Sequence, residues 1–119
     1  MFEKINTFIL CVNDLNESKN FYKNLLGLKQ LADKPKWKTF LLGDTILGLK
    51  PWTPGTEDER KVKHGVYIGF DVADVDQAIQ QLEKKGAHVL VDPRNEEFGR
   101  YAEIADPDGH IIMLVSELK

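Results

Sequence analysis

The chain has 119 residues, 42% of them hydrophobic and 29% charged, with a formal net charge of −3 and a single cysteine. This composition is ordinary for one globular domain, and one cysteine excludes an internal disulfide framework. The small negative charge argues against nucleic-acid binding, and no apolar run approaches the roughly 18 residues of a membrane span. The start of the chain lacks signal-peptide features, so we expect a cytoplasmic protein that contacts neither nucleic acid nor membrane.

The first half of the chain predicts a strand, a helix and three more strands. A nearly continuous apolar run at residues 5–12 predicts a strand that is buried on both faces. Asp14 is expected to cap the helix that follows, and Gly27 to end it. Further strands are predicted at residues 28–31, 36–42 and 45–50.

The second half repeats this order about sixty residues later. Between the halves, residues 51–61 contain two prolines, a glycine and a charge run, which predict a linker. An apolar strand pattern at residues 66–72 precedes a helix between Asp74 and Gly86, and Asp106-Pro107-Asp108-Gly109 is a strong turn signal. The remaining strands are predicted at residues 89–91, 100–105 and 110–115. The repeat predicts two similar units, each with one helix covering one face of a small sheet.

Motifs in both halves carry a family resemblance. They are Val12-Asn13-Asp14-Leu15-Asn16-Glu17-Ser18, Phe21-Tyr22, Leu26-Gly27-Leu28, Gly69-Phe70-Asp71-Val72-Ala73-Asp74-Val75-Asp76 and Asp106-Pro107-Asp108-Gly109. Together with the repeat, they resemble the vicinal oxygen chelate superfamily, which includes glyoxalase I, extradiol dioxygenases, fosfomycin-resistance transferases and bleomycin-resistance proteins. The resemblance implies an α+β fold in which two βαβββ modules, residues 1–54 and 62–119 of one domain (1–119), form a curled mixed sheet around a cleft. It also implies a homodimer.

Metal-dependent members of this superfamily use four ligand positions, two in each module, filled by His, Glu or Gln. The flanking motifs align these positions with Thr7, Gly48, Tyr67 and Met113. Glycine has no donor atom, a thioether is a poor ligand for a first-row dication, and neutral hydroxyls are weak ligands. We therefore expect no metal and no cofactor, provided that the strand register holds, because a slip of one residue would change every face.

The same cleft would then hold an organic molecule. The candidate ligand-binding residues are Thr7, Trp37, Phe40, Gly48, Trp52, Tyr67, Arg100 and Met113. Aromatic and methionine side chains suit adaptable apolar contacts, although Trp37, Phe40 and Trp52 also fit a core or an interface, and Arg100 also fits an exposed loop edge.

Other chemistry-bearing residues give weaker signals. Glu103 lies inside a strand but has no identifiable catalytic partner, so we expect an exposed strand position. His64, His88 and His110 lack ligand spacing and are expected at the surface or in loops.

Three functions remain open from the sequence. The leading hypothesis is a metal-free protein that binds a small molecule, such as an antibiotic or another hydrophobic ligand, and sequesters it without turnover, as bleomycin-resistance proteins do. The second is a glyoxalase- or dioxygenase-like metalloenzyme with displaced ligands, and the third is a scaffold or regulatory interaction module. The sequence names no ligand and leaves open whether the modules pair within one chain or between two.

Overall fold

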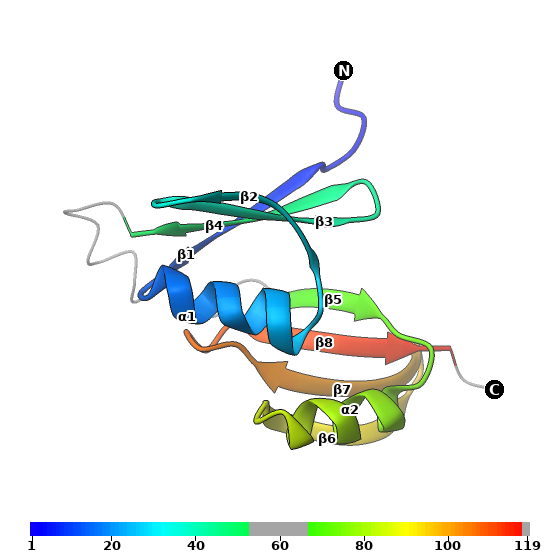
Figure 1. Cartoon of the computed structure of the whole chain (residues 1–119). Coiled ribbons are helices and arrows are strands. Elements are labelled where there is room, and N and C mark those ends of the chain that lie inside the picture. Colours follow the sequence, from blue (N-terminus) through cyan, green and yellow to red (C-terminus); the bar gives the residue numbers. More distant parts are fainter. Residues whose placement is uncertain (53–66, 118–119) are drawn as a thin grey trace. The chain divides into compact units, whose positions relative to one another are not determined.

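The same strand order occurs twice in the computed structural model, which describes residues 1–52 and 67–117 (Figure 1). The first unit, Met1–Glu57, contains β1 (Thr7–Val12), α1 (Leu15–Asn20), the π-helical segment η1 (Phe21–Leu25), β2 (Lys29–Lys34), β3 (Trp37–Leu42) and β4 (Thr45–Pro51). The second unit, Asp58–Lys119, contains β5 (Tyr67–Asp71), α2 (Val75–Lys84), β6 (His88–Glu96), β7 (Gly99–Ala105) and β8 (Ile111–Ser116).

Each unit builds a four-stranded mixed sheet, with the orders β1-β4-β3-β2 and β5-β8-β7-β6. The first strand of a unit runs parallel to its last strand, and the other neighbours are antiparallel. The predicted α+β fold with two strand–helix–three-strand modules is confirmed. Of the expected linker 51–61, Pro51 ends β4, and residues 53–61 lie outside the described residues.

The helix of the first unit begins and ends where the sequence predicts. The Asp14 carboxylate accepts hydrogen bonds from the backbone N–H groups of Asn16 and Glu17, both at 3.0 Å, as expected of an N-cap. Gly27 follows the helix with a φ of +75°, a left-handed conformation that favours glycine. The predicted helix includes residues 21–25, but its sequence periodicity did not indicate the π-helical hydrogen bonding of η1.

Helix α1 and segment η1 cover one face of the first sheet. Tyr22 of η1 is fully buried, and its ring centroid lies 6.2 Å from that of Phe40 on β3. The covered face also contributes Val12, Leu47 and Leu49, which are at most 2% exposed. Because strand side chains alternate between faces, the remaining residues define the helix-free face of the first sheet: Thr7, Ile9, Cys11, Trp37, Thr39, Leu41, Ile46, Gly48 and Lys50.

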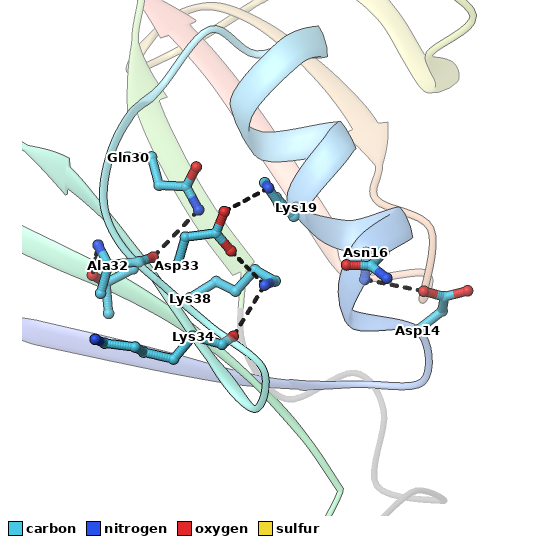
Figure 2. A network of polar contacts seen from close by, with 9 residues as sticks. Asp14, Asn16, Lys19, Gln30, Ala32, Asp33, Lys34 and Lys38 are labelled. Carbon is cyan, nitrogen blue, oxygen red and sulfur yellow. Dashed lines mark hydrogen bonds and ion pairs between the residues drawn. The ribbon is translucent and has the colours of Figure 1, made fainter.

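A charged network joins the β2–β3 hairpin to α1 on the covered side (Figure 2). The Lys38 ammonium, on a side chain that is only 7% exposed, donates to the Asp33 carboxylate and to the carbonyl oxygen of Lys34. Lys19 of α1 donates to the other Asp33 oxygen at 2.7 Å. Hydrogen bonds from Lys19 and Lys38 lower the pKa of Asp33 to about 2. The buried ammonium of Lys38 is therefore neutralised by a shared carboxylate.

The second unit follows the same plan. Asp74 caps α2 by accepting from the backbone N–H of Gln77 at 3.0 Å, and Gly86 follows the helix with a φ of +94°. Helix α2 packs on one face of its sheet (Figure 1). Its core residues are Val75, Ile79, Ala102, Ile104, Ile112 and Leu114. The alternating residues define the helix-free face of the second sheet: Tyr67, Gly69, Asp71, Val91, Tyr101, Glu103, Ala105, Ile111, Met113 and Val115.

Strand β6 is longer than predicted. The expected strand covered residues 89–91, whereas β6 runs from His88 to Glu96 and includes Pro93. Its pairing with β7 shifts register between Val89 and Val91 and again between Val91 and Arg94. Proline has no backbone N–H and is tolerated at such irregularities and at sheet edges, and β6 is the edge strand of its sheet.

Candidate functional site

Trp37 lies over Gly48 on the helix-free face of the first sheet. A Cβ atom at position 48 would lie 2.5 Å from Cη2 of Trp37 and 3.1 Å from its Cζ3. Gly48 pairs with Thr39 on β3, so Trp37, two residues earlier, approaches Gly48 diagonally across the two strands. The indole therefore fills the space in which any side chain at position 48 would begin.

Thr7 shares this face but not this contact. In the parallel ladder Thr7 lies opposite Ile46, whereas Gly48 lies opposite Ile9. The exposed Thr7 hydroxyl donates a hydrogen bond to Oδ1 of its neighbour Asn6 at 2.8 Å. The structure thus places Thr7 at the exposed beginning of β1, on the same face as the Trp37–Gly48 contact.

Two further aromatic candidates of the first unit have different surroundings. Phe40 lies on the helix-covered face, where it is fully buried and close to the ring of Tyr22. Successive side chains of a strand point to opposite faces of the sheet, and Phe40 is three residues after Trp37. The Phe40 side chain therefore points away from the face that carries Trp37 and Gly48. Trp52 directly follows β4, as predicted, and is half-buried.

Tyr67 and Met113 share the helix-free face of the second sheet. Tyr67 begins β5 and is 50% exposed. Met113 on β8 pairs with Gly69 on β5, and a Cβ atom at position 69 would lie 3.6 Å from Cε of Met113. The methionine side chain therefore extends across Gly69 at ordinary contact distance. The phenol of Tyr67, the thioether of Met113 and the exposed Gly69 make this surface suitable for adaptable apolar contact.

Glu103 lies on the same face, and our expectation that it is exposed was wrong. Only 9% of this residue is exposed, and in the register it lies between Met113 on β8 and Val91 on β6. The available signal was the alternation along β7, where Ala102 and Ile104 take the helix side and leave Glu103 on the other face. What the sequence could not show is that this residue is buried.

The residues at the four positions that the resemblance assigns to metal ligands do not fit a divalent cation. In the first unit, position 48 has no donor atom and its side-chain space is filled by Trp37, while Thr7 offers a neutral hydroxyl. In the second unit, Tyr67 offers a phenol and Met113 a thioether that lies against Gly69. No carboxylate or imidazole at these positions offsets the cost of dehydrating a dication.

Arg100 lies on the helix side of the second sheet. Its guanidinium donates to both Asp76 oxygens, at 3.0 and 2.8 Å, and to Oδ1 of Asn95 at 3.1 Å. This bidentate contact lowers the pKa of Asp76 and raises that of Arg100, chiefly through the side-chain hydrogen bonds. The structure thus separates Arg100 from Tyr67 and Met113 and ties β7 to the first turn of α2.

A cavity of about 280 Å³ lies beside this ion pair. Its lining is mainly polar and consists of Ala73, Asp74, Val75, Asp76, Asn95, Arg100, Ser116 and Glu117. Asp74 accepts the N-terminal hydrogen bond of α2, and Asp76 holds Arg100, so the principal charged groups here already have structural roles.

The Asp106–Gly109 turn brings two carboxylates near His110. Asp106, Asp108 and His110 have possible ligand atoms within 4.8 Å of one another. However, the Asp106 carboxylate accepts from the backbone N–H groups of Asp108 and His110, and Nδ1 of His110 lies 2.7 Å from its other oxygen. The hydrogen bond to Asp106 raises the pKa of His110. These contacts are those of a turn that fixes the entry into β8. As predicted, His88 is exposed, at the start of β6, whereas His64 lies outside the described residues.

The repeated topology defines a protein of the class built from two βαβββ modules. The family model of the Glyoxalase/Bleomycin resistance protein/Dioxygenase superfamily matches residues 4–114, and the chain belongs to this superfamily. Across the described residues, no helix is both long and apolar enough to cross a bilayer.

Similar proteins include an antibiotic resistance protein, an antibiotic binding protein and a transferase. The chain is 28% identical over 114 residues to the phenazine antibiotic resistance protein EhpR of Enterobacter agglomerans, covering 90% of this chain and 87% of EhpR. It is 26% identical to the metallothiol transferase FosB of Staphylococcus saprophyticus subsp. saprophyticus, covering 92% of this chain and 74% of FosB. The crystal structure of TnmS3, an antibiotic binding protein from Streptomyces sp. CB03234, matches with a TM-score of 0.78 and 29% identity, covering 98% of this chain and 97% of TnmS3.

Proposed function

We propose that this protein binds a small aromatic organic molecule, such as an antibiotic, without a metal ion and without converting it. The observation that carries the proposal is the indole of Trp37 in the side-chain space of Gly48, because it replaces a ligand position by an aromatic surface. Aromatic and thioether groups bind planar apolar molecules through burial and dispersion. The similarity to EhpR, a phenazine antibiotic resistance protein, and to TnmS3, an antibiotic binding protein, supports antibiotic sequestration.

The proposed binding residues lie on the helix-free faces. They are Thr7, Trp37 and Gly48 on the first sheet and Tyr67 and Met113 on the second, with Trp52 beside β4. The proposal gives Phe40 and Arg100 structural roles instead, because Phe40 packs under the helix and Arg100 holds Asp76. No cofactor is part of the proposed site.

Isothermal titration calorimetry of phenazine binding to the purified protein tests the proposal. We expect saturable binding with a dissociation constant on the order of 10 µM, a modest affinity for a ligand of this size held mainly by apolar contacts. Trp37→Ala should weaken binding about tenfold, since removal of an aromatic contact costs roughly 1–1.5 kcal/mol. Phe2→Ala, which removes an aromatic ring that is 97% exposed, is the matched control and should bind like the original protein.

Recovery of unchanged phenazine after prolonged incubation is the second expected result. Stoichiometric bound metal together with turnover that a chelator abolishes would instead favour a metalloenzyme, the possibility to which the similarity to FosB points. Absence of binding by phenazine and by a wider panel of aromatic compounds would favour an interaction module.

We also propose that the protein is a cytoplasmic homodimer. This rests on the resemblance to dimeric members of the superfamily and on the single cysteine of the chain, which fits a reducing compartment. Light scattering coupled to size-exclusion chromatography should give a mass of twice the chain mass, and a monomer at micromolar concentration would contradict the dimer.

A further inference from the structure

Glu103 is a buried carboxylate without a protein partner in the ranges 1–52 and 67–117. No hydrogen bond or ion pair reaches its side chain from those residues, and only 9% of the residue is exposed. Other buried polar side chains in these ranges are satisfied: Thr39 accepts from the Ala32 N–H, Lys38 donates to Asp33, and Asp106 accepts from His110. Glu103 departs from this pattern, and burial of an unpaired carboxylate is costly.

None of the residues next to Glu103 in the sheet forms a hydrogen bond or an ion pair with its carboxylate. Met113 and Val91 lie opposite it on the two adjacent strands, and Tyr101 and Ala105 are its neighbours along β7 on the same face. The ring of Tyr101 packs edge-to-face against Phe98, with centroids 5.6 Å apart, and Arg94 lies over it at 5.8 Å. The carboxylate is therefore set among mainly apolar groups, where a single hydrogen-bond donor would be worth more than in water.

We propose that Glu103 is the polar anchor of the ligand site and that the ligand is an aromatic compound carrying a protonated amine. This inference rests on the proposed function and specifies its ligand class. An ammonium group would form a charge-assisted hydrogen bond with the carboxylate and remove the cost of leaving it unpaired. A neutral hydroxyl analogue would form only a weaker hydrogen bond with the carboxylate, and an anionic analogue would add repulsion.

The strand register places Glu103 in line with the apolar surface formed by Met113 and Gly69. Glu103, Met113 and Gly69 are paired in one row across β7, β8 and β5. Two strand spacings amount to about 10 Å, which is close to the length of a two- or three-ring aromatic system. An aromatic ligand that lies over Met113 and Gly69 therefore brings an amino substituent at its end to Glu103.

A matched pair of probes tests the inference. Naphthylmethylamine is protonated at neutral pH, and naphthalenemethanol has the same ring with a neutral hydroxyl. We expect the original protein to bind the amine about tenfold more tightly than the alcohol, the size of one charge-assisted hydrogen bond. Glu103→Gln should reduce this preference to about twofold or less while leaving the affinity for the alcohol unchanged. Glu83→Gln, the same substitution at an exposed position of α2, should keep the full preference.

The possible results separate this inference from the proposed function. If both probes bind without a preference for the amine, or if Glu103→Gln keeps the preference, the anchor is refuted and the binding function stands. If neither probe binds although phenazine does, the anchor is refuted and the binding function stands. If phenazine and the wider aromatic panel also fail to bind, both are contradicted.

Thermal unfolding of the ligand-free protein gives an independent readout. Glu103→Gln should raise the unfolding midpoint by about 3 °C, because it removes an unpaired buried charge at nearly constant volume. A lowered midpoint would show that Glu103 is already paired within the protein and would overturn the inference whatever the binding result.

Discussion

The indole of Trp37 contacts the backbone of Gly48 so closely that no other residue fits at position 48 without movement of the ring. Cη2, Cζ3 and Cζ2 of Trp37 would lie 2.5, 3.1 and 3.2 Å from a Cβ atom at that position. The two residues are therefore coupled: the absence of a side chain at position 48 on β4 leaves the space that the ring of Trp37 from β3 occupies. Substitution of either residue should change the effect of substituting the other.

Gly48→Ala should destabilise the protein by about 1–3 kcal/mol, the usual cost of inserting a group into a packed site. In a Trp37→Leu background the same substitution should cost less than about 0.5 kcal/mol, because the shorter side chain leaves room for the methyl group. Urea unfolding of the four proteins in this cycle measures the coupling. Equal costs in the two backgrounds would show that the ring does not occupy the space above Gly48.

Asp33 should make the stability of the protein sensitive to acid. Its folded-state pKa of about 2 is below the ordinary value of 3.8, so its contribution is present above pH 3.8 and is lost as the pH falls towards about 2. Asp33→Asn should lower the urea midpoint at neutral pH, since the Lys38 ammonium then loses its counter-ion. It should also flatten the pH dependence in this window.

The double variant Asp33→Asn with Lys38→Met is the matched control for the Asp33 prediction. It removes the buried charge together with its partner and should recover most of the stability lost in Asp33→Asn. If it is no more stable than the single variant, the ion pair to Lys38 is not the cause of the loss.

His110 should make the stability of the protein depend on pH with the opposite sign. Its folded-state pKa is raised above 6.5 by the hydrogen bond to Asp106, so its contribution is complete below pH 6.5 and is lost as the pH rises through the folded-state value. Nuclear magnetic resonance titration of the His110 ring should show the raised pKa. Asp106→Asn keeps an oxygen for the backbone N–H groups of Asp108 and His110 but removes the charge, and it should lower the pKa of His110. An unchanged titration midpoint in that variant would exclude Asp106 as the cause.

Arg100→Lys should lower the thermal unfolding midpoint, because lysine cannot reproduce the bidentate contact with Asp76. The affinity for phenazine should change by less than about twofold, since the contact lies at a partly exposed ion pair on the helix side. Calorimetric binding and unfolding measured on the same preparations separate the two effects. Weakened binding with unchanged stability would return Arg100 to the list of ligand-binding residues.

The local features of the fold were accessible from the sequence. The caps at Asp14 and Asp74 and the helix ends at Gly27 and Gly86 depend on neighbouring residues, and all four were predicted correctly. The extent of β6 was not predicted, because Pro93 interrupts the strand pattern in the sequence. In the structure, two irregularities in the pairing of β6 with β7 accommodate this proline in the sheet.

The candidate site was harder to predict because it depends on contacts between distant residues. Thr7, Gly48, Tyr67 and Met113 could be placed on strands from their motifs, and alternation along β3 could have separated Phe40 from Trp37. Arg100 forms an ion pair with Asp76, which is 24 residues away, and the sequence around Arg100 gives no sign of this contact. Likewise, Glu103 is buried and lies between Met113 and Val91 in the register, and strand propensity carries no information on such packing.

The parallel pairing of β1 with β4, and of β5 with β8, has a consequence for how the chain folds. In both units the opening strand joins the sheet only through the closing one, so the hairpins β3–β4 and β7–β8 must form before the sheet can acquire its edge. During synthesis, all four strands of the amino-terminal sheet are available once Pro51 has left the ribosome. In the second unit, β5 has no strand to pair with until β8 emerges. We therefore expect nascent chains that stop before Ile111 to expose an unpaired β5, and such truncated products to be the aggregation-prone species of this protein.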